Sequence, residues 1–277
     1  MLLLCIAVIS LAAGAAVCFG CGAFATLAWL WLLPVSFLGV FLGLLAVCFA
    51  ILMVMCKMVD QNVPQEDDNK FYRIVADLIV ESAFIVLRIH VKKTGLEKVP
   101  TDGRFMLICN HVNNSDPIIL LNCLRKSQLA FISKRENSTM FVIGPMMHKI
   151  QCQLINREND REALKTILRC IQILKEDKAS IAVFPEGGIH DDLKFHHFRP
   201  GVFKIAQKAN VPIVICTLKG TKDVVDNIYR LKPSYVELDV LEVIPAEELK
   251  GMTTVDIAHR CHDIMAANLP AEMIAED

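Results

Sequence analysis

Residues 104–125, RFMLICNHVNNSDPIILLNCLR, change from a strand pattern to a helix pattern within one short stretch. An apolar run at 104–110 is typical of a buried strand, and a polar turn at 112–115 follows it. From Pro117 to Arg125 the apolar residues return at helical spacing. A strand, a turn and a helix in this order predict one strand–helix unit of an α/β domain.

The same alternation continues on both sides of this stretch. Further runs have the β-branched or aromatic composition of strands and are bounded by turn residues: IHVKKTG (89–95), LAFISK (129–134), CQLIN (152–156), SIAVFPEG (180–187), VPIVICTLKG (211–220) and YVELDVLEVI (235–244). Helical patterns lie at 160–175, 202–209 and 254–268. The sequence therefore predicts an α/β domain with a central, largely parallel or mixed sheet flanked by helices. The chain lacks G-x-G-x-x-G, P-loop and G-x-S-x-G motifs, which argues against dinucleotide binding, Walker-type phosphoryl transfer and serine-hydrolase chemistry.

The first 58 residues (1–58) are predicted to form a transmembrane helical hairpin. No Asp, Glu, Lys, Arg or His occurs from Met1 to Cys56, and one crossing needs only about 20 apolar residues. We expect the break between two helices near 29–34, where two tryptophans suited to the lipid interface precede Pro34. A cleaved signal peptide is the alternative for the first half, although no basic residue precedes the apolar run. Because Lys and Arg appear only after the second span, the positive-inside tendency predicts an integral membrane protein with its remaining domain on the cytoplasmic side.

The rest of the chain is predicted to be a polar linker at 59–69 and one domain at 70–277. The domain opens with FYRIVADLIVESAFIVLR at 71–88, whose apolar residues recur at helical spacing. Such an amphipathic helix either lies against the bilayer or packs as an ordinary core helix. The neighbouring hairpin favours the bilayer.

Composition limits the partners that the chain can have. A formal net charge of −1 indicates no nucleic-acid partner, and the membrane is the expected one. The 11 cysteines are odd in number and lack disulfide-like spacing, which suits a reducing compartment. Acidic and histidine side chains crowd one loop, at His190, Asp191, Asp192, His196 and His197. Their spacings match no standard ligand set, so we expect a polar loop without a metal.

The turn after the first quoted strand carries candidate catalytic residues. His111 and Asp116 form an H-x-x-x-x-D pair in NHVNNSDP. An imidazole is suited to take a proton from an alcohol near neutral pH, and a carboxylate can orient it and stabilise its charged form. The pair therefore fits a general base with its partner. Asp116 before Pro117 also fits a helix N-cap, which needs no catalysis.

Three further motifs follow in order, LINR at 154–157, FPEGG at 184–188 and VPIV at 211–214. With the H-x-x-x-x-D pair, the region from about Phe71 to Lys219 resembles the 1-acylglycerol-3-phosphate acyltransferases, a family of glycerolipid acyltransferases. The resemblance implies a glycerolipid-acyltransferase-type fold. It also implies transfer of an acyl group from acyl-CoA or acyl-ACP, the co-substrate, to the sn-2 hydroxyl of lysophosphatidic acid, with no cofactor and no acyl-enzyme.

The resemblance also implies roles for particular residues. His111 is the general base and Asp116 its partner. Arg157, helped by Asn156, binds the acceptor's phosphate, as suits a planar guanidinium. Lys134 in SKRE is a second phosphate contact, with Arg135 a weaker candidate. Glu186 lies near the acceptor's glycerol, and Gly187 lets backbone N–H groups approach the substrate.

Departures from the family pattern leave other functions open. After Gly187 the family usually has a small hydroxyl residue and a basic one, whereas this chain continues Gly188-Ile189-His190, so another lysophospholipid acceptor is an alternative. A thioesterase with Cys109 as nucleophile is a second, because Cys109 shares a strand face with His111. A lipid-binding homologue without turnover is a third.

Overall fold

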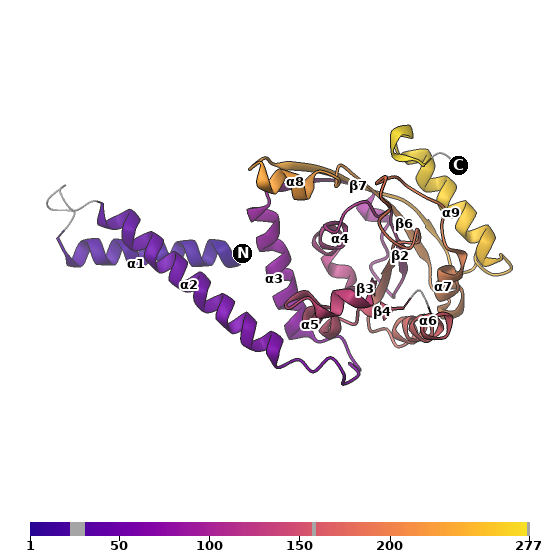
Figure 1. Ribbon diagram of the computed structural model, residues 1–277, viewed down its shortest axis with the longest axis horizontal. Helices are drawn as coiled ribbons and strands as arrows, with labels where there is room; N and C mark the ends of the chain where they lie inside the picture. Colours follow the sequence, from indigo (N-terminus) through magenta and orange to yellow (C-terminus); the bar gives the residue numbers. More distant parts are fainter. Residues whose placement is uncertain (23–30, 157–158, 276–277) are drawn as a thin grey trace. The chain divides into compact units, whose positions relative to one another are not determined.

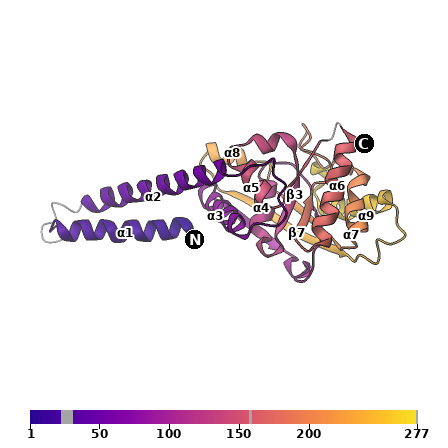
Figure 2. The same ribbon diagram turned by 90° about the horizontal axis from the view of Figure 1, so that it is seen from below.

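The computed structural model describes residues 1–22, 31–156 and 159–275, and the chain divides into two units, Met1–Val63 and Pro64–Asp277. The first unit contains α1 (Leu2–Gly20) and α2 (Leu32–Lys57), which lie side by side as a hairpin in Figures 1 and 2. Both helices are long and apolar enough to cross a membrane. Part of the predicted break near 29–34 falls in residues 23–30, outside the described residues. Pro34 lies in the first turn of α2, where its missing N–H costs no hydrogen bond.

Small residues let the two helices of the hairpin approach closely. The buried positions of α1 are Ile6, Ser10, Gly14 and Cys18, one on each successive turn. A Cβ added to Gly14 would lie 3.1 Å from Ser36 Oγ of α2, so the backbones are near contact there. The Ser10 hydroxyl donates to Ile6 O at 2.7 Å within its own helix, which leaves no unsatisfied donor in apolar surroundings. The remaining apolar side chains of both helices are largely exposed, as is typical of helices that face lipid.

The second unit is built on one mixed sheet with the strand order β1-β7-β6-β2-β5-β3-β4. The strands are β1 (Ile89–Thr94), β2 (Met106–Ile108), β3 (Leu129–Lys134), β4 (Gln153–Ile155), β5 (Ser180–Val183), β6 (Ile213–Lys219) and β7 (Ser234–Ile244). Every neighbouring pair is parallel except β6 and β7, which are antiparallel. The prediction of an α/β domain with a largely parallel or mixed sheet flanked by helices and preceded by an apolar hairpin is confirmed.

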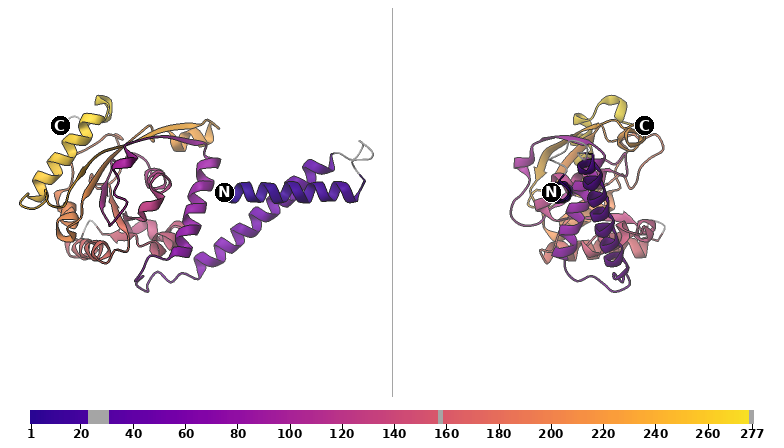
Figure 3. Two further views of the ribbon diagram at one scale, coloured as in Figure 1. Left: turned by 180° about the vertical axis from the view of Figure 1, so that it is seen from behind. Right: turned by 90° about the vertical axis from the view of Figure 1, so that its left-hand side faces the viewer.

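Helices cover both faces of this sheet. They are α3 (Lys70–Val86), α4 (Asp116–Cys123), α5 (Ile143–Lys149), α6 (Asp160–Lys175), α7 (Lys204–Ala209), α8 (Val224–Tyr229) and α9 (Thr254–Asn268). Figure 2 shows α6, α7 and α9 on one side of the sheet and α3, α4 and α5 on the other, and Figure 3 shows the same separation from behind. Short 3-10 turns at 96–98, 125–127, 135–139, 200–203 and 271–273 complete the connections.

The central strand β2 divides the core into two halves. Met106 and Ile108 pack in a cluster with α6, α7 and α9, whereas Leu107 and Cys109 pack with α3 and α4. All three residues of β2 are 0% exposed. Because each buried large aliphatic side chain stabilises a fold by about 1.5–3 kcal/mol, the strand that leads to His111 is among the most firmly held parts of the domain.

A buried ion pair fixes the start of α3 to the sheet domain. Arg73 Nε lies 2.7 Å from Asp68 Oδ2, and both side chains are almost fully buried. The same guanidinium donates to Leu129 O and Ile150 O. Residues 64–69, within the predicted linker, therefore pack on the domain. The outer face of α3 exposes Phe71, Ile74 and other apolar side chains.

Candidate active site

The residues singled out in the sequence meet at one edge of the sheet. Strands β2, β5, β3 and β4 are parallel neighbours in that order, so their carboxyl ends lie at the same edge. His111 follows β2, Glu186 follows β5, Lys134 ends β3 and Asn156 follows β4. Ligand sites of open α/β sheets lie outside the carboxyl ends of their strands, and this edge is therefore the candidate active site.

His111 and Asp116 are in direct contact. His111 Nδ1 lies 2.9 Å from Asp116 Oδ2, and the same oxygen accepts from the backbone N–H groups of Val112 and Asn113, each at 2.9 Å. The Asp116 side chain is fully buried, whereas that of His111 is 15% exposed. A carboxylate bonded at Nδ1 makes Nε2 the basic nitrogen. Among the described residues none forms a hydrogen bond with Nε2, so this nitrogen is available to a substrate.

The alternative interpretation of Asp116 as a helix N-cap is wrong. The N-cap of α4 is Ser115, and Asp116 is already the first helical residue. Its side chain turns back along the polar loop to the imidazole and to two backbone N–H groups instead of capping the helix. Because the preceding turn is short, the aspartate closes it with these bonds and presents one oxygen to His111.

An aromatic ring that was not predicted as a site residue also packs on the face of the His111 imidazole. The ring of Phe184 stacks on His111 with centroids 4.0 Å apart and an interplanar angle of 16°. Phe131 of β3 supports Phe184 from a centroid distance of 6.0 Å. Stacking and the Asp116 bond together leave His111 with one orientation. The motif FPEGG contains Phe184, but nothing in the sequence indicates which ring it would contact.

Glu186 holds two loops together across the site. Its Oε1 accepts from the His111 backbone N–H at 2.8 Å and its Oε2 from the His196 backbone N–H at 2.9 Å. The residue is 3% exposed. Burial raises the pKa of Glu186 to about 8, against the lowering effect of the two N–H donors. Both oxygens are therefore occupied by the protein, and the expected contact with the acceptor's glycerol stays a prediction.

Gly187 occupies a position that suits no other residue. Its φ of +89° lies in the region that favours glycine, and a Cβ there would lie 2.5 Å from Nε of Arg199. Its N–H donates to Phe184 O at 3.1 Å, so that donor closes the turn. A direct bond from this N–H to substrate stays a prediction. The exposed side chain of Arg199, which sequence analysis did not select, packs against this turn.

The predicted phosphate contacts lie further along the same edge. Lys134 is exposed and lies two strands from β2, or roughly 10 Å at the usual strand spacing. Asn156 Nδ2 donates to Glu162 Oε2 at 2.9 Å, and Arg135 Nη1 lies 3.5 Å from the same oxygen. Arg157, the expected principal phosphate ligand, lies outside the described residues. Among the predicted phosphate contacts that the structure describes, Lys134 is an exposed cation beside the Asn156–Glu162 pair.

Cys109 is not placed as a nucleophile. Its side chain is 1% exposed and packs in the core with α3 and α4. Burial raises the pKa of the Cys109 thiol well above its usual range, so the reactive thiolate is not formed near neutral pH. The structure contradicts the thioesterase alternative, because the Cys109 side chain lies in the core and not at the surface where a substrate could reach it.

The histidine-rich loop is held by its own contacts. His190 stacks on His196 at 3.8 Å, and His196 Nε2 lies 2.9 Å from Asp192 Oδ1. In the described part of the chain, no group of three or more His, Cys, Asp or Glu side chains is arranged to hold a metal ion. Through its backbone bond to Glu186, the loop closes the site beside His111.

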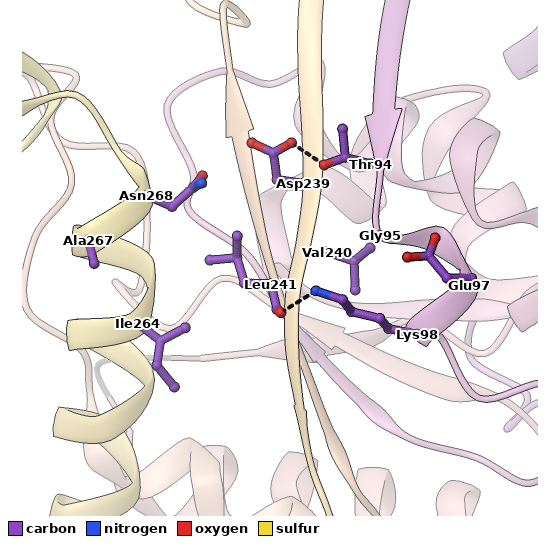
Figure 4. Close-up of a pocket in the computed structure, with 10 residues that line it drawn as sticks. All are labelled: Thr94, Gly95, Glu97, Lys98, Asp239, Val240, Leu241, Ile264, Ala267 and Asn268. Carbon is purple, nitrogen blue, oxygen red and sulfur yellow. Dashed lines mark hydrogen bonds between the residues drawn. The ribbon is translucent and has the colours of Figure 1, made fainter.

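A pocket elsewhere in the domain is separate from this edge. It lies between the turn at 96–98, β7 and α9, and Figure 4 shows Lys98, Leu241 and Ile264 among its lining. Lys98 Nζ donates across it to Leu241 O at 2.8 Å. None of the predicted site residues lines this pocket, so the candidate chemistry belongs to the open sheet edge.

Comparison with known proteins shows which proteins the chain is similar to. The family model described as "Acyltransferase" matches residues 90–219, which include His111 and Glu186. The chain is 30% identical over 189 residues to a "Probable 1-acyl-sn-glycerol-3-phosphate acyltransferase" of Mycoplasma pneumoniae, covering 66% of this chain and 68% of that protein. It is 29% identical to a 1-acyl-sn-glycerol-3-phosphate acyltransferase of Chlamydomonas reinhardtii, covering 63% of this chain and about half, 51%, of the relative.

A solved structure has the same fold. The crystal structure of the 1-acyl-sn-glycerophosphate (LPA) acyltransferase PlsC from Thermotoga maritima superposes with a TM-score of 0.61 at 19% identity, covering 79% of this chain and 86% of that one. At this identity the likeness concerns the fold alone. The family is shown by the Mycoplasma pneumoniae relative, and this chain is an enzyme of the 1-acyl-sn-glycerol-3-phosphate acyltransferase family.

Proposed function

We propose that the protein transfers a fatty acyl group from an acyl thioester to the sn-2 hydroxyl of lysophosphatidic acid and so forms phosphatidic acid. The observation that carries the proposal is the His111–Asp116 pair, with Nε2 of His111 unoccupied at the carboxyl edge of the sheet. The printed names of the relatives support lysophosphatidic acid as the acceptor. The donor is acyl-CoA or acyl carrier protein, and no cofactor takes part.

The reaction is a direct transfer. His111 Nε2 removes the proton of the acceptor hydroxyl while its oxygen attacks the thioester carbonyl. Collapse of the tetrahedral intermediate breaks the carbon–sulfur bond, and the imidazolium returns its proton to the departing thiolate. Asp116 stabilises the imidazolium through the 2.9 Å contact with Nδ1. General-base help of this kind contributes roughly a hundred to ten thousandfold in rate.

Positioning of the acceptor is assigned to the basic end of the edge. Lys134 is an exposed cation at the end of β3, and Arg157 follows β4 in the sequence. A phosphate held there extends its glycerol along the edge towards His111. Positioning a reactant in this manner supplies a large part of the rate enhancement in enzymes. Glu186 acts by holding the backbone of His111 in place.

A membrane location fits this reaction, because acceptor and product are bilayer lipids. The two apolar helices α1 and α2 supply the membrane association, and we propose that the catalytic unit lies on the cytoplasmic side. There it meets a donor that is dissolved in the cytosol.

A second acceptor class has one observation in its favour. Where the family usually has a small hydroxyl residue and a basic residue, this chain has Gly188-Ile189-His190, and Nε2 of His190 is buried rather than exposed to a phosphate. A lysophospholipid with a larger headgroup is therefore the alternative acceptor.

A panel of acceptors tests these proposals. The detergent-purified full chain is incubated with labelled acyl-CoA or acyl carrier protein and with lysophosphatidic acid or a lysophospholipid that carries a headgroup. Preferred formation of phosphatidic acid supports the proposal, and preferred acylation of another lysolipid replaces the acceptor. The Cys109→Ser variant serves as the matched control, because direct transfer predicts that it keeps its activity. Loss of transfer in that variant with an intact fold would instead favour a cysteine nucleophile.

A further inference from the structure

The end of α8 exposes large apolar side chains that the fold does not use. Tyr229 is 84% exposed and Leu231 80% exposed. They lie beside the last turn of α3, where Val86 is 68% exposed, and Figure 1 shows α8 next to that end of α3. Arg88 Nη1 joins the two segments by donating to Leu231 O at 2.6 Å. Isolated exposed apolar residues are common, but a cluster of this kind indicates a binding surface.

The backbone of Leu231 is the least expected feature of this cluster. The N–H of Lys232 donates to Asn227 O at 2.9 Å and that of Leu231 to Ile228 O at 3.2 Å, which is the pattern of a Schellman turn. The residue after the cap in this motif is left-handed and is usually glycine. Here Leu231 has a φ of +51°, a conformation unfavourable for a branched side chain. Its side chain is nevertheless directed to solvent, so packing within the domain does not explain the leucine.

Positive charges surround these apolar side chains. Arg88, Arg230 and Lys232 are all exposed, and within the described part of the chain neither Arg230 nor Lys232 forms an ion pair. The acidic residues of this segment, Asp223 and Asp226, lie at the start of α8 and not at its end. We define the α8 patch as the side chains at this end of α8 and α3: Val86, Arg88, Tyr229, Arg230, Leu231 and Lys232. Apolar and aromatic residues with Lys and Arg at their rim are typical of surfaces that enter the headgroup region of anionic membranes.

The α8 patch is joined to the candidate active site. The segment that leads into α8 follows β6, whose parallel neighbour β2 leads to His111. Asn113, in the loop between His111 and Asp116, donates from Nδ2 to Lys222 O at 3.1 Å. The patch and the catalytic histidine therefore lie at the same edge of the sheet.

We propose that the α8 patch is a membrane contact of the catalytic unit, in addition to the apolar hairpin, and that it binds the surface of a bilayer containing anionic lipids. Tyr229 and Leu231 enter the interface, while Arg230 and Lys232 pair with lipid phosphates. The strained backbone of Leu231 presents this side chain to the bilayer. The contact holds the edge that carries His111 at the membrane surface.

The contact is measured with a single fluorescent reporter in the full chain. The two tryptophans, Trp29 and Trp31, are replaced by phenylalanine, and Tyr229→Trp supplies the patch reporter. The protein is reconstituted in vesicles of phosphatidylcholine, alone or mixed with phosphatidylglycerol, whose acyl chains carry bromine as a quencher. Val255→Trp, at a 45% exposed position of α9, supplies the control reporter in a separate variant.

The proposal predicts quenching of the patch reporter that increases with phosphatidylglycerol and decreases with salt, while the control reporter is not quenched. The double variant Arg230→Glu/Lys232→Glu lowers quenching to the level of the control, whereas Lys208→Glu/Lys250→Glu, at two other exposed lysines, leaves it unchanged. Leu231→Gly relieves the backbone and raises or keeps the melting temperature, yet it decreases quenching. If Leu231 had only a structural role, its replacement would not lower the quenching while the melting temperature is kept or raised.

Equal quenching of the patch reporter and the control reporter in both kinds of vesicle would overturn the proposal. So would a blue shift of the patch reporter's emission that depends on protein concentration without lipid, because it would assign the patch to a second copy of the chain. Neither readout requires catalysis, so a failure of the proposed acyl transfer is distinguishable from a failure of this contact.

Discussion

The geometry around Asp116 allows its charge to be removed with little change in shape. Oδ2 accepts from His111 Nδ1 and from the backbone N–H groups of Val112 and Asn113, whereas Oδ1 is buried and has no hydrogen-bond partner among the described residues. An asparagine can place its carbonyl oxygen at the Oδ2 position and its amide nitrogen at the other. Asp116→Asn therefore keeps three acceptor bonds and removes the negative charge beside the imidazole.

The expected cost of Asp116→Asn is mainly catalytic. Loss of the orienting charge from a histidine base costs up to roughly ten thousandfold in kcat in the serine proteases, and general-base help as a whole is worth roughly a hundred to ten thousandfold. We expect kcat to fall by about a hundred to ten thousandfold, which is about 3–5.5 kcal/mol of transition-state stabilisation. The unfolding free energy should fall by only about 1–3 kcal/mol, because one buried amide N–H₂ lacks a partner.

Asp116→Ala is the matched comparison. It leaves the N–H groups of Val112 and Asn113 without their acceptor, at about 1–3 kcal/mol for each group that stays buried, and so lowers stability as well as activity. Initial rates of lysolipid acylation and thermal unfolding in detergent are measured for both variants. If Asp116→Asn keeps more than about a tenth of the wild-type kcat, the lost transition-state stabilisation is less than about 1.4 kcal/mol. The carboxylate charge then does not assist the base, whatever the change in melting temperature.

Three further variants test other parts of the site. Burial raises the pKa of Glu186 from 4.5 to about 8, so its contribution to stability is fully present below pH 4.5 and is lost as the pH rises through 8. The unfolding free energy of the wild type should decline over this window by a few kcal/mol, about 5 at most. Denaturant titrations at successive pH values should show a flatter decline for Glu186→Gln. An equal decline in both proteins would contradict the assignment of this pH dependence to Glu186. Lys134→Met should raise KM for the phosphate-bearing acceptor about tenfold with kcat little changed, whereas an equal KM would remove Lys134 from the phosphate site. Gly187→Ala should lower the unfolding free energy by about 1–3 kcal/mol because of the positive φ at this position. Thermal unfolding of the double variant Gly187→Ala/Arg199→Ala should show that only the loss caused by the 2.5 Å contact with Arg199 is restored.

The candidate base could be predicted from local sequence because its geometry is local. His111 and Asp116 lie five positions apart, and the polar turn between them is short enough to fold the carboxylate back to the ring. The strands were predictable for a similar reason, since β2 and β6 are continuous apolar runs bounded by turn residues. The order of strands in the sheet does not follow from such runs, because it depends on how distant segments pair.

The features that the sequence did not predict all depend on long-range contacts. The stacking of Phe184 on His111 and the bond from the His111 N–H to Glu186 were not predicted, although Glu186 itself was selected as a site residue. Both residues directly follow β5, 73 and 75 positions after His111, and only the pairing of β5 with β2 brings them to the imidazole ring and its backbone N–H. Strand alternation predicted one shared face for Cys109 and His111, but both residues follow the last residue of β2, and alternation does not show where the core ends. In the structure Cys109 is inside that limit and His111 is beyond it.

The proposed reaction depends on removal of the acceptor hydroxyl proton by His111. The most direct test is phosphatidic acid formation from lysophosphatidic acid and a labelled acyl thioester, catalysed by wild-type protein and His111→Ala at equal concentration in detergent. We expect product in the wild type and a decrease of at least about a hundredfold in the variant, with the same melting temperature within a few degrees. Equal product from both proteins would show that His111 is not the base.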